Sequence, residues 1–124
     1  MKKYSKESII ERYEKSCEIM YQATLNGDYK SNNQEGAKLL KIFKYFENNR
    51  ELAFECISEM LNSKNVVVRT KAAAYCLALN ERTDIAEKVL EEIADDESNG
   101  IFSFNAKMTL QVWRENGFLK IYQS

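Results

Sequence analysis

Apolar residues recur at three- and four-residue steps along most of the chain, which is the spacing of one face of an α-helix. Short polar breaks interrupt this pattern, and two of them contain glycine. Alternation with a period of two, the mark of a half-buried strand, is nowhere sustained. The pattern therefore predicts six helices joined by short turns, at about residues 8–26, 31–48, 52–61, 66–79, 84–94 and 103–116.

Several helix ends carry recognisable signals. Ser8 and Glu11 fit a Ser-x-x-Glu capping box, which places the first helix start near Ser8. The sequence Asn-Gly-Asp at 26–28 ends that helix, because glycine readily adopts the left-handed conformation of a C-cap. Thr83 is the expected cap of the fifth helix. The last residues, 118–124, fit either an extended segment or a short turn of helix.

The periodicity also predicts which side chains face the core. Short turns favour antiparallel neighbours, so six helices read as three successive helical hairpins. In the first predicted helix the expected inward residues are Ile10, Tyr13, Cys17, Met20, Tyr21 and Thr24. In the fifth they are Ile85, Ala86, Val89, Leu90 and Ile93, and in the sixth they are Phe104, Ala106, Met108, Leu110 and Trp113.

The fourth predicted helix, VVVRTKAAAYCLAL at 66–79, is unusual for its small side chains. Consecutive alanines let neighbouring helices approach closely on more than one side. A helix in the middle of a stack needs this, because it touches its own partner and the hairpins before and after it. We therefore expect the fourth helix to be the central one.

The same stretch resembles the second helix of HEAT-type repeats. The pair Val68–Arg69 follows a polar turn, and Ala72, Ala73 and Leu77 come one to two turns later, although the usual aspartate and proline of the turn are absent. Toward the C-terminus, Phe102–Ser103, Met108–Leu110 and Trp113 resemble the last helix of a small bacterial HEAT-like family of unknown function. The resemblance implies an all-α, right-handed α/α superhelix (HEAT/ARM-like) occupying residues 1–124 as one domain.

Composition narrows the chemistry. The 124 residues include no histidine and no proline, and the net charge is −1. Without histidine the chain lacks the commonest general acid–base and metal ligand. Cys17, Cys56 and Cys76 are too widely spaced for a disulfide framework, so we expect free, buried thiols. No apolar run has the length of a signal peptide or membrane span, and we expect a cytoplasmic protein with no membrane contact.

Charge is unevenly distributed. Residues 81–97 hold eight carboxylates against Arg82 and Lys88, a local net charge of −6. These carboxylates lie mostly on one helix and its following loop, so we expect no metal site and no cofactor. They form either a solvated face or a docking face for a basic partner. Candidate contacts with a protein partner are Asp84, Glu87, Glu91 and Asp95, and then Lys41, Tyr45 and Lys71.

The absence of a converged polar cluster argues against an enzyme. Small bacterial HEAT-like proteins of this kind often look like immunity proteins, so the resemblance implies a protein that binds and neutralises a cognate toxin. A nuclease with a positively charged active-site groove is a toxin that would complement the acidic stretch. The alternatives are a nucleic-acid-binding HEAT-like protein and a structural scaffold. Nucleic acid is the weaker alternative, because the fourth helix carries only Arg69 and Lys71 as cations. The oligomeric state stays open.

Overall fold

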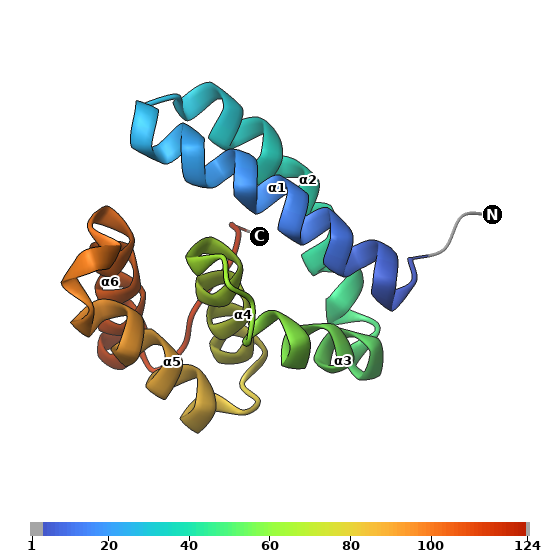
Figure 1. Ribbon diagram of the computed structural model, residues 1–124. Helices are drawn as coiled ribbons and strands as arrows, with labels where there is room; N and C mark the ends of the chain where they lie inside the picture. The colour runs from blue at the N-terminus through green and yellow to red at the C-terminus, as the bar shows by residue number, and fades with distance from the viewer. Residues whose placement is uncertain (1–3, 124) are drawn as a thin grey trace.

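The computed structural model describes residues 4–123 as an all-α protein (Figure 1). Within this range there are six α-helices, one short 3-10 helix and no strand. The prediction of an all-α architecture is confirmed, including the number of α-helices. The elements are α1 (Lys6–Asn26), α2 (Tyr29–Glu47), α3 (Arg50–Met60), α4 (Val66–Leu79), α5 (Thr83–Asp95), η1 (Glu97–Asn99) and α6 (Ile101–Asn116).

The first helix starts earlier than predicted. Ser5, not Ser8, is the N-cap of α1, and Ser8 is the third helical residue. The two serines form a reciprocal capping box, since the Ser5 Oγ accepts from the Ser8 backbone N–H at 3.1 Å and the Ser8 Oγ accepts from the Ser5 N–H at 3.0 Å. The predicted Ser8–Glu11 box is wrong because a second capping serine lies one turn upstream. Gly27 ends the helix with φ 71°, as expected.

Two other helix starts also differ from the prediction. Asp28 caps α2 by accepting from the Ser31 backbone N–H at 3.1 Å, so this helix begins at Tyr29 and not at Ser31. Thr83 is the first residue of α5 and does not cap it. The residue before it, Arg82, takes a left-handed conformation with φ 58°, which turns the chain between α4 and α5 without a side-chain cap.

The fourth helix lies at the centre of the molecule. It packs against α1, α3, α5 and α6, and Figure 1 shows it between the α1–α2 pair and the α5–α6 pair. Ala72 and Ala73 are completely buried. Small side chains allow this close approach from several sides, as the sequence predicted. Successive helices pack on their neighbours throughout, in agreement with the expected α/α superhelical arrangement.

One continuous core joins all six α-helices. Its aromatic centre lies between α1, α2 and α4, where the Tyr75 ring contacts Phe43 at 4.7 Å and Tyr13 at 5.9 Å between ring centroids. The three cysteines are free and buried, which confirms the prediction. Burial raises the pKa of Cys17 to about 12 and those of Cys56 and Cys76 to about 11, so the thiols are neutral small apolar groups at pH 7.

Some predicted core faces are wrong. In α1, Ile9 is fully buried and Ile10 only partly. In α5, Ile85 is 51% exposed. In α6, Phe104 and Met108 are 57% and 38% exposed, whereas Phe102, Ala106 and Leu110 are buried and Trp113 packs partly buried against the core. The reason is that α6 carries two apolar stripes of the same period, and only the position of its neighbours decides which one is covered.

The C-terminal segment forms no helix up to residue 123 and returns across the molecule to α2. Leu119, Ile121 and Tyr122 pack against the core. The Tyr122 hydroxyl donates to Glu47 Oε1 at 2.7 Å, and the Lys44 ammonium lies 4.7 Å from the centroid of the Tyr122 ring. Of the two alternatives for this tail, the structure shows the non-helical one.

Candidate protein-interaction surfaces

The seven candidate contact residues do not converge on one surface. Four lie on α5, two lie on α2, and Lys71 lies on the central helix α4. Positions three or four residues apart share one side of a helix, so Asp84, Lys88, Glu91 and Asp95 form the outward face of α5. That face is exposed, whereas Ala86, Leu90 and Ile93 on the other side are buried. The three groups must therefore be considered separately.

Two of the α5 carboxylates already have a partner within the chain. Arg114 of α6 donates from Nε and Nη2 to Glu87 Oε2 at 3.0 and 2.6 Å, and from Nη2 to Glu91 Oε2 at 2.6 Å. These hydrogen bonds with Glu87 and then Glu91 raise the pKa of Arg114. The interaction fixes α6 against α5 and neutralises part of the acidic face. Glu87 and Glu91 are consequently less available to a partner than the sequence suggested.

Of the other acids in residues 81–97, Glu81 accepts from Arg50 Nη1 at 3.1 Å, and four others have no such pairing within residues 4–123. Asp84, Glu92, Asp95 and Glu97 are exposed, and none of them forms an ion pair among residues 4–123. Asp96 has a local structural role, since its Oδ1 accepts from the Ser98 backbone N–H and hydroxyl and caps η1. Those two hydrogen bonds lower the pKa of Asp96. We call Asp84, Glu92, Asp95 and Glu97 the free acidic set.

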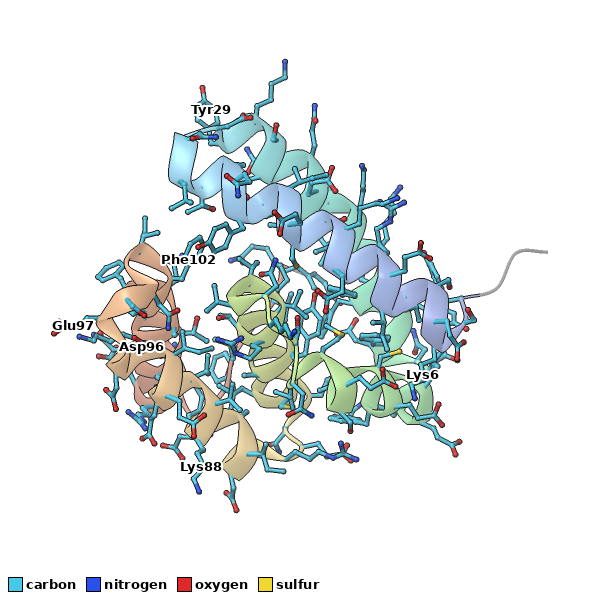
Figure 2. The ribbon with its side chains drawn as sticks, in the orientation of Figure 1. Lys6, Tyr29, Lys88, Asp96, Glu97 and Phe102 are labelled. Carbon is cyan, nitrogen blue, oxygen red and sulfur yellow. The ribbon has the colours of Figure 1, made fainter. Side chains whose placement is uncertain are left out.

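An exposed apolar stripe follows the outer side of α6. Ile101, Phe104, Met108 and Val112 are spaced by three, four and four residues and are 50%, 57%, 38% and 38% exposed. They lie opposite the buried residues of the same helix. Asp96 and Glu97 stand at the same edge of the molecule as the start of α6 in Figure 2. Sequence reasoning assigned Phe104 and Met108 to the core and missed this α6 apolar stripe.

Lys41 lines a basic cavity on the α1–α2 pair, and Tyr45 contacts Tyr4, another residue of its lining. The cavity, of about 330 Å³, is lined by Arg12 and Lys41 among others. Tyr4 packs edge-on against Tyr45 with 4.8 Å between ring centroids. Tyr45, one of the candidate contact residues, is only partly exposed. Among the described residues neither Arg12 nor Lys41 forms an ion pair.

Near this cavity, α2 contributes a buried carboxylate. Glu35 is 6% exposed and accepts from the Lys38 ammonium at 3.0 Å. The pKa of Glu35 is lowered, first by the nearby Ser16 hydroxyl and then by Lys38. The Ser16 hydroxyl lies close to the carboxylate but does not form a hydrogen bond of ordinary geometry with it. Lys38 is thus engaged within the chain, which leaves Arg12 and Lys41 as the free cations of the basic cavity.

The Arg69 of the HEAT-like pair lies in a groove of mixed charge. It donates to the Ser63 carbonyl at 2.8 Å, which closes the turn before α4. The groove, of about 430 Å³, is also lined by Lys64 and by Glu14 and Glu18 of α1. Carboxylates beside the cations oppose the binding of a phosphate backbone. This groove therefore gives no support to nucleic-acid binding by α4.

Lys71, which we considered as a contact residue, instead lines a cavity between α1, α2, α4 and α6. Its side chain is partly buried, and burial lowers the pKa of its ammonium group. It forms no ion pair with any residue in the described range. The position of Lys71 is therefore more suited to a small ligand than to a broad protein surface.

Comparison of the chain with models of protein families, with curated proteins and with solved structures finds no match. None of the helices in residues 4–123 combines the length and the apolar character needed to cross a bilayer. In the same range, no three side chains of the metal-ligating types come together in one cluster. A function is therefore proposed from the surfaces described above.

Proposed function

We propose that this chain is a non-enzymatic protein-binding module that holds its partner with the outer side of the α5–α6 pair. The observation that carries the proposal is the α6 apolar stripe together with the free acidic set. Contiguous exposed apolar side chains on a small domain mark an interaction site more often than a solvated face. In this arrangement the apolar side chains supply affinity, and the carboxylates select a cationic partner.

The partner class that fits best is a basic protein. Its cations would face the free acidic set, and an apolar patch would cover Phe104 and Met108, the middle of the stripe. Opposite charges speed association and disfavour wrong partners. In line with the HEAT-like resemblance, we propose an immunity protein that neutralises a cognate bacterial toxin, such as a nuclease whose substrate groove is positively charged.

The proposal is tested by capture of the products of neighbouring genes and by binding kinetics at several salt concentrations. The double variant Phe104→Ser/Met108→Ser should weaken binding about tenfold or more, mainly through faster dissociation, because it removes the apolar centre of the contact. Asp84→Lys/Asp95→Lys should instead slow association and reduce its salt dependence. In cells, the wild-type chain should protect against the linked toxin.

The matched control is Glu51→Lys/Glu55→Lys on α3, which makes the same change of charge at two other exposed positions. This variant should keep most of the association rate. If both charge variants slow association equally, only net charge matters and α5 is not the docking face. Absence of a tight partner together with absence of protection from the linked toxin contradicts the proposal as a whole.

A second candidate function rests on the basic cavity of the α1–α2 pair. Arg12 and Lys41 provide two cations that have no ion-pair partner within residues 4–123, and the Tyr4–Tyr45 pair lies beside them. This combination suits phosphate and base contacts of a nucleic acid. A salt-sensitive mobility shift of duplex or single-stranded DNA, lost in Arg12→Glu/Lys41→Glu, would favour this alternative. No shift at low salt would exclude it.

A further inference from the structure

The cavity around Lys71 is distinct from the proposed docking face. It has a volume of about 260 Å³ and lies where α1, α2, α4 and α6 meet. Phe102 contributes to it from the buried side of α6, opposite the α6 apolar stripe, and Figure 2 shows Phe102 directed from α6 toward α1. Pockets for drug-sized ligands are roughly 300–1,000 Å³, so this cavity suits a smaller molecule.

One part of the cavity wall is apolar. Met20 of α1, Val67 of α4 and Phe102 of α6 all line it. The Phe102 ring also stacks on Tyr21 of α1, with 4.7 Å between centroids and 12° between planes, which holds this side of the cavity in place. An occupant therefore meets a preformed apolar surface contributed by three different helices.

The other part of the wall is polar, and most of its groups are already engaged. The Asn32 amide donates to Thr24 Oγ1 at 3.0 Å, and the Thr70 hydroxyl donates to the Val66 carbonyl at 2.8 Å. Thr24 accepts in its bond, so its own hydroxyl hydrogen stays available to an acceptor. Among the described residues that line the cavity, Lys71 alone carries a formal charge.

An ammonium group in such a site is costly without a counter-ion. Burial lowers the pKa of Lys71, and the one titratable neighbour acting in the opposite direction is the Cys17 thiol, which is itself neutral at pH 7. Other cations of the chain do have a carboxylate partner: Lys38 pairs with Glu35, and Arg114 pairs with Glu87. Lys71 lacks such a partner among residues 4–123.

We propose that the Lys71 cavity binds a small organic carboxylate whose carboxyl group pairs with the Lys71 ammonium and whose apolar body packs against Met20, Val67 and Phe102. The Thr24 hydroxyl donates a second hydrogen bond to the carboxylate. This site does not depend on the proposed partner-binding function, because the α6 apolar stripe and the free acidic set contribute nothing to its lining. Charge and apolar surface together select the ligand.

Benzoate is a suitable probe, and benzamide is its neutral counterpart of the same shape. At pH 7 and constant ionic strength, saturating benzoate should raise the thermal midpoint of the wild-type chain by about 3–6 °C, while benzamide should leave it nearly unchanged. Lys71→Met keeps an unbranched apolar stem of similar length without the charged nitrogen and should lose the response. Lys88→Met, at an exposed position on α5, should keep it.

A second measurement on the wild-type lysines covers the case in which Lys71→Met fails to fold. Reductive methylation with ¹³C-formaldehyde gives each lysine an NMR signal, and the Lys71 signal should titrate at a higher pH with benzoate than without, because a bound anion favours the charged amine. The Lys88 signal should not move. A wild-type midpoint unaffected by benzoate, or a Lys71 titration unchanged by it, would overturn the proposal.

Discussion

The hydroxyl oxygens of Tyr13 and Tyr75 lie 2.8 Å apart inside the core, so that a hydrogen bond joins α1 to the central helix α4. Tyr13 also donates toward the Leu39 carbonyl of α2 at 3.3 Å. Tyr75 is 3% exposed, and Tyr13 supplies its one hydrogen-bond partner among the described residues. Two buried hydroxyls thus connect α1, α2 and α4. Removing the Tyr75 hydroxyl leaves Tyr13 with an acceptor, whereas removing the Tyr13 hydroxyl leaves Tyr75 without one within residues 4–123.

This asymmetry gives a first prediction. Tyr75→Phe leaves Tyr13 bonded to Leu39 and should destabilise by about 1 kcal/mol, the net value of one hydrogen bond. Tyr13→Phe leaves the buried Tyr75 hydroxyl without its partner and should cost about 1–3 kcal/mol. Urea denaturation of both variants measures the difference. Equal losses would show that the Tyr75 hydroxyl finds another acceptor when Tyr13 is absent.

A second prediction concerns the centre of α4. Ala73 has no exposed surface and is packed between helices, so Ala73→Leu should overpack the site and destabilise by about 1–3 kcal/mol. The matched control is Ala37→Leu, which adds the same side chain at an exposed position of α2 and should stay within about 0.5 kcal/mol. Chemical denaturation compares the two. A tolerated leucine at position 73 would contradict the close packing of α4.

The third prediction separates the two apolar stripes of α6. Leu110 is 4% exposed, and Leu110→Ala should destabilise by about 2–5 kcal/mol through the cavity it leaves. Phe104→Ser removes a larger apolar side chain, yet it should change stability by about 0.5 kcal/mol or less because Phe104 is already solvated. If Phe104→Ser proves as damaging as Leu110→Ala, the outer stripe is part of the core and is not available to a partner.

The buried thiols predict a loss of stability at alkaline pH. Burial raises the pKa of Cys17 from its ordinary 9.0 to about 12, so the folded chain keeps a proton that the unfolded chain releases above pH 9. The stabilisation is complete below pH 9 and is lost as the pH rises from 9 to about 12. Cys56 and Cys76 act in the same direction, up to about pH 11.

The measurement is urea denaturation under reducing conditions at pH 7.5, 9 and 10.5. The free energy of unfolding of the wild type should fall over this series. That of Cys17→Ala should start from its own value at pH 7.5 and fall less steeply. The lowered pKa of Lys71 acts in the opposite direction, because the unfolded chain keeps this proton to a higher pH than the folded chain does. Parallel slopes would show that Cys17 does not titrate differently in the two states.

The local pattern predicted the helices well because a helix is a local structure. Gly27 and Gly117 both adopt the left-handed conformation at helix ends, and the polar turns fall where expected. The starts were less accurate, since Ser5 and Ser8 are equally plausible caps and only the backbone path around them decides between the two. The alanines at 72 and 73 correctly indicated a helix that touches others on several sides.

The candidate contacts were harder to predict. Glu87 and Glu91 look like free surface acids in the sequence, but after folding both accept hydrogen bonds from Arg114, which lies 27 and 23 positions away along the chain. Lys71 looks like an ordinary lysine on a helix surface, and its lack of a carboxylate partner depends on side chains from four helices. No local sequence pattern distinguishes Lys71, Glu87 and Glu91 from the other lysines and glutamates of the chain.

The sequence by itself determined the all-α class, the number and approximate length of the helices, and the central place of the small-residue helix, because these depend on periodicity and side-chain size. Only the tertiary structure decided which stripe of α6 is buried, which acids remain unpaired, and which lysine lines the cavity between four helices. The reason is that burial and ion pairing depend on contacts between distant segments, and the spacing of residues along a single helix does not specify those contacts.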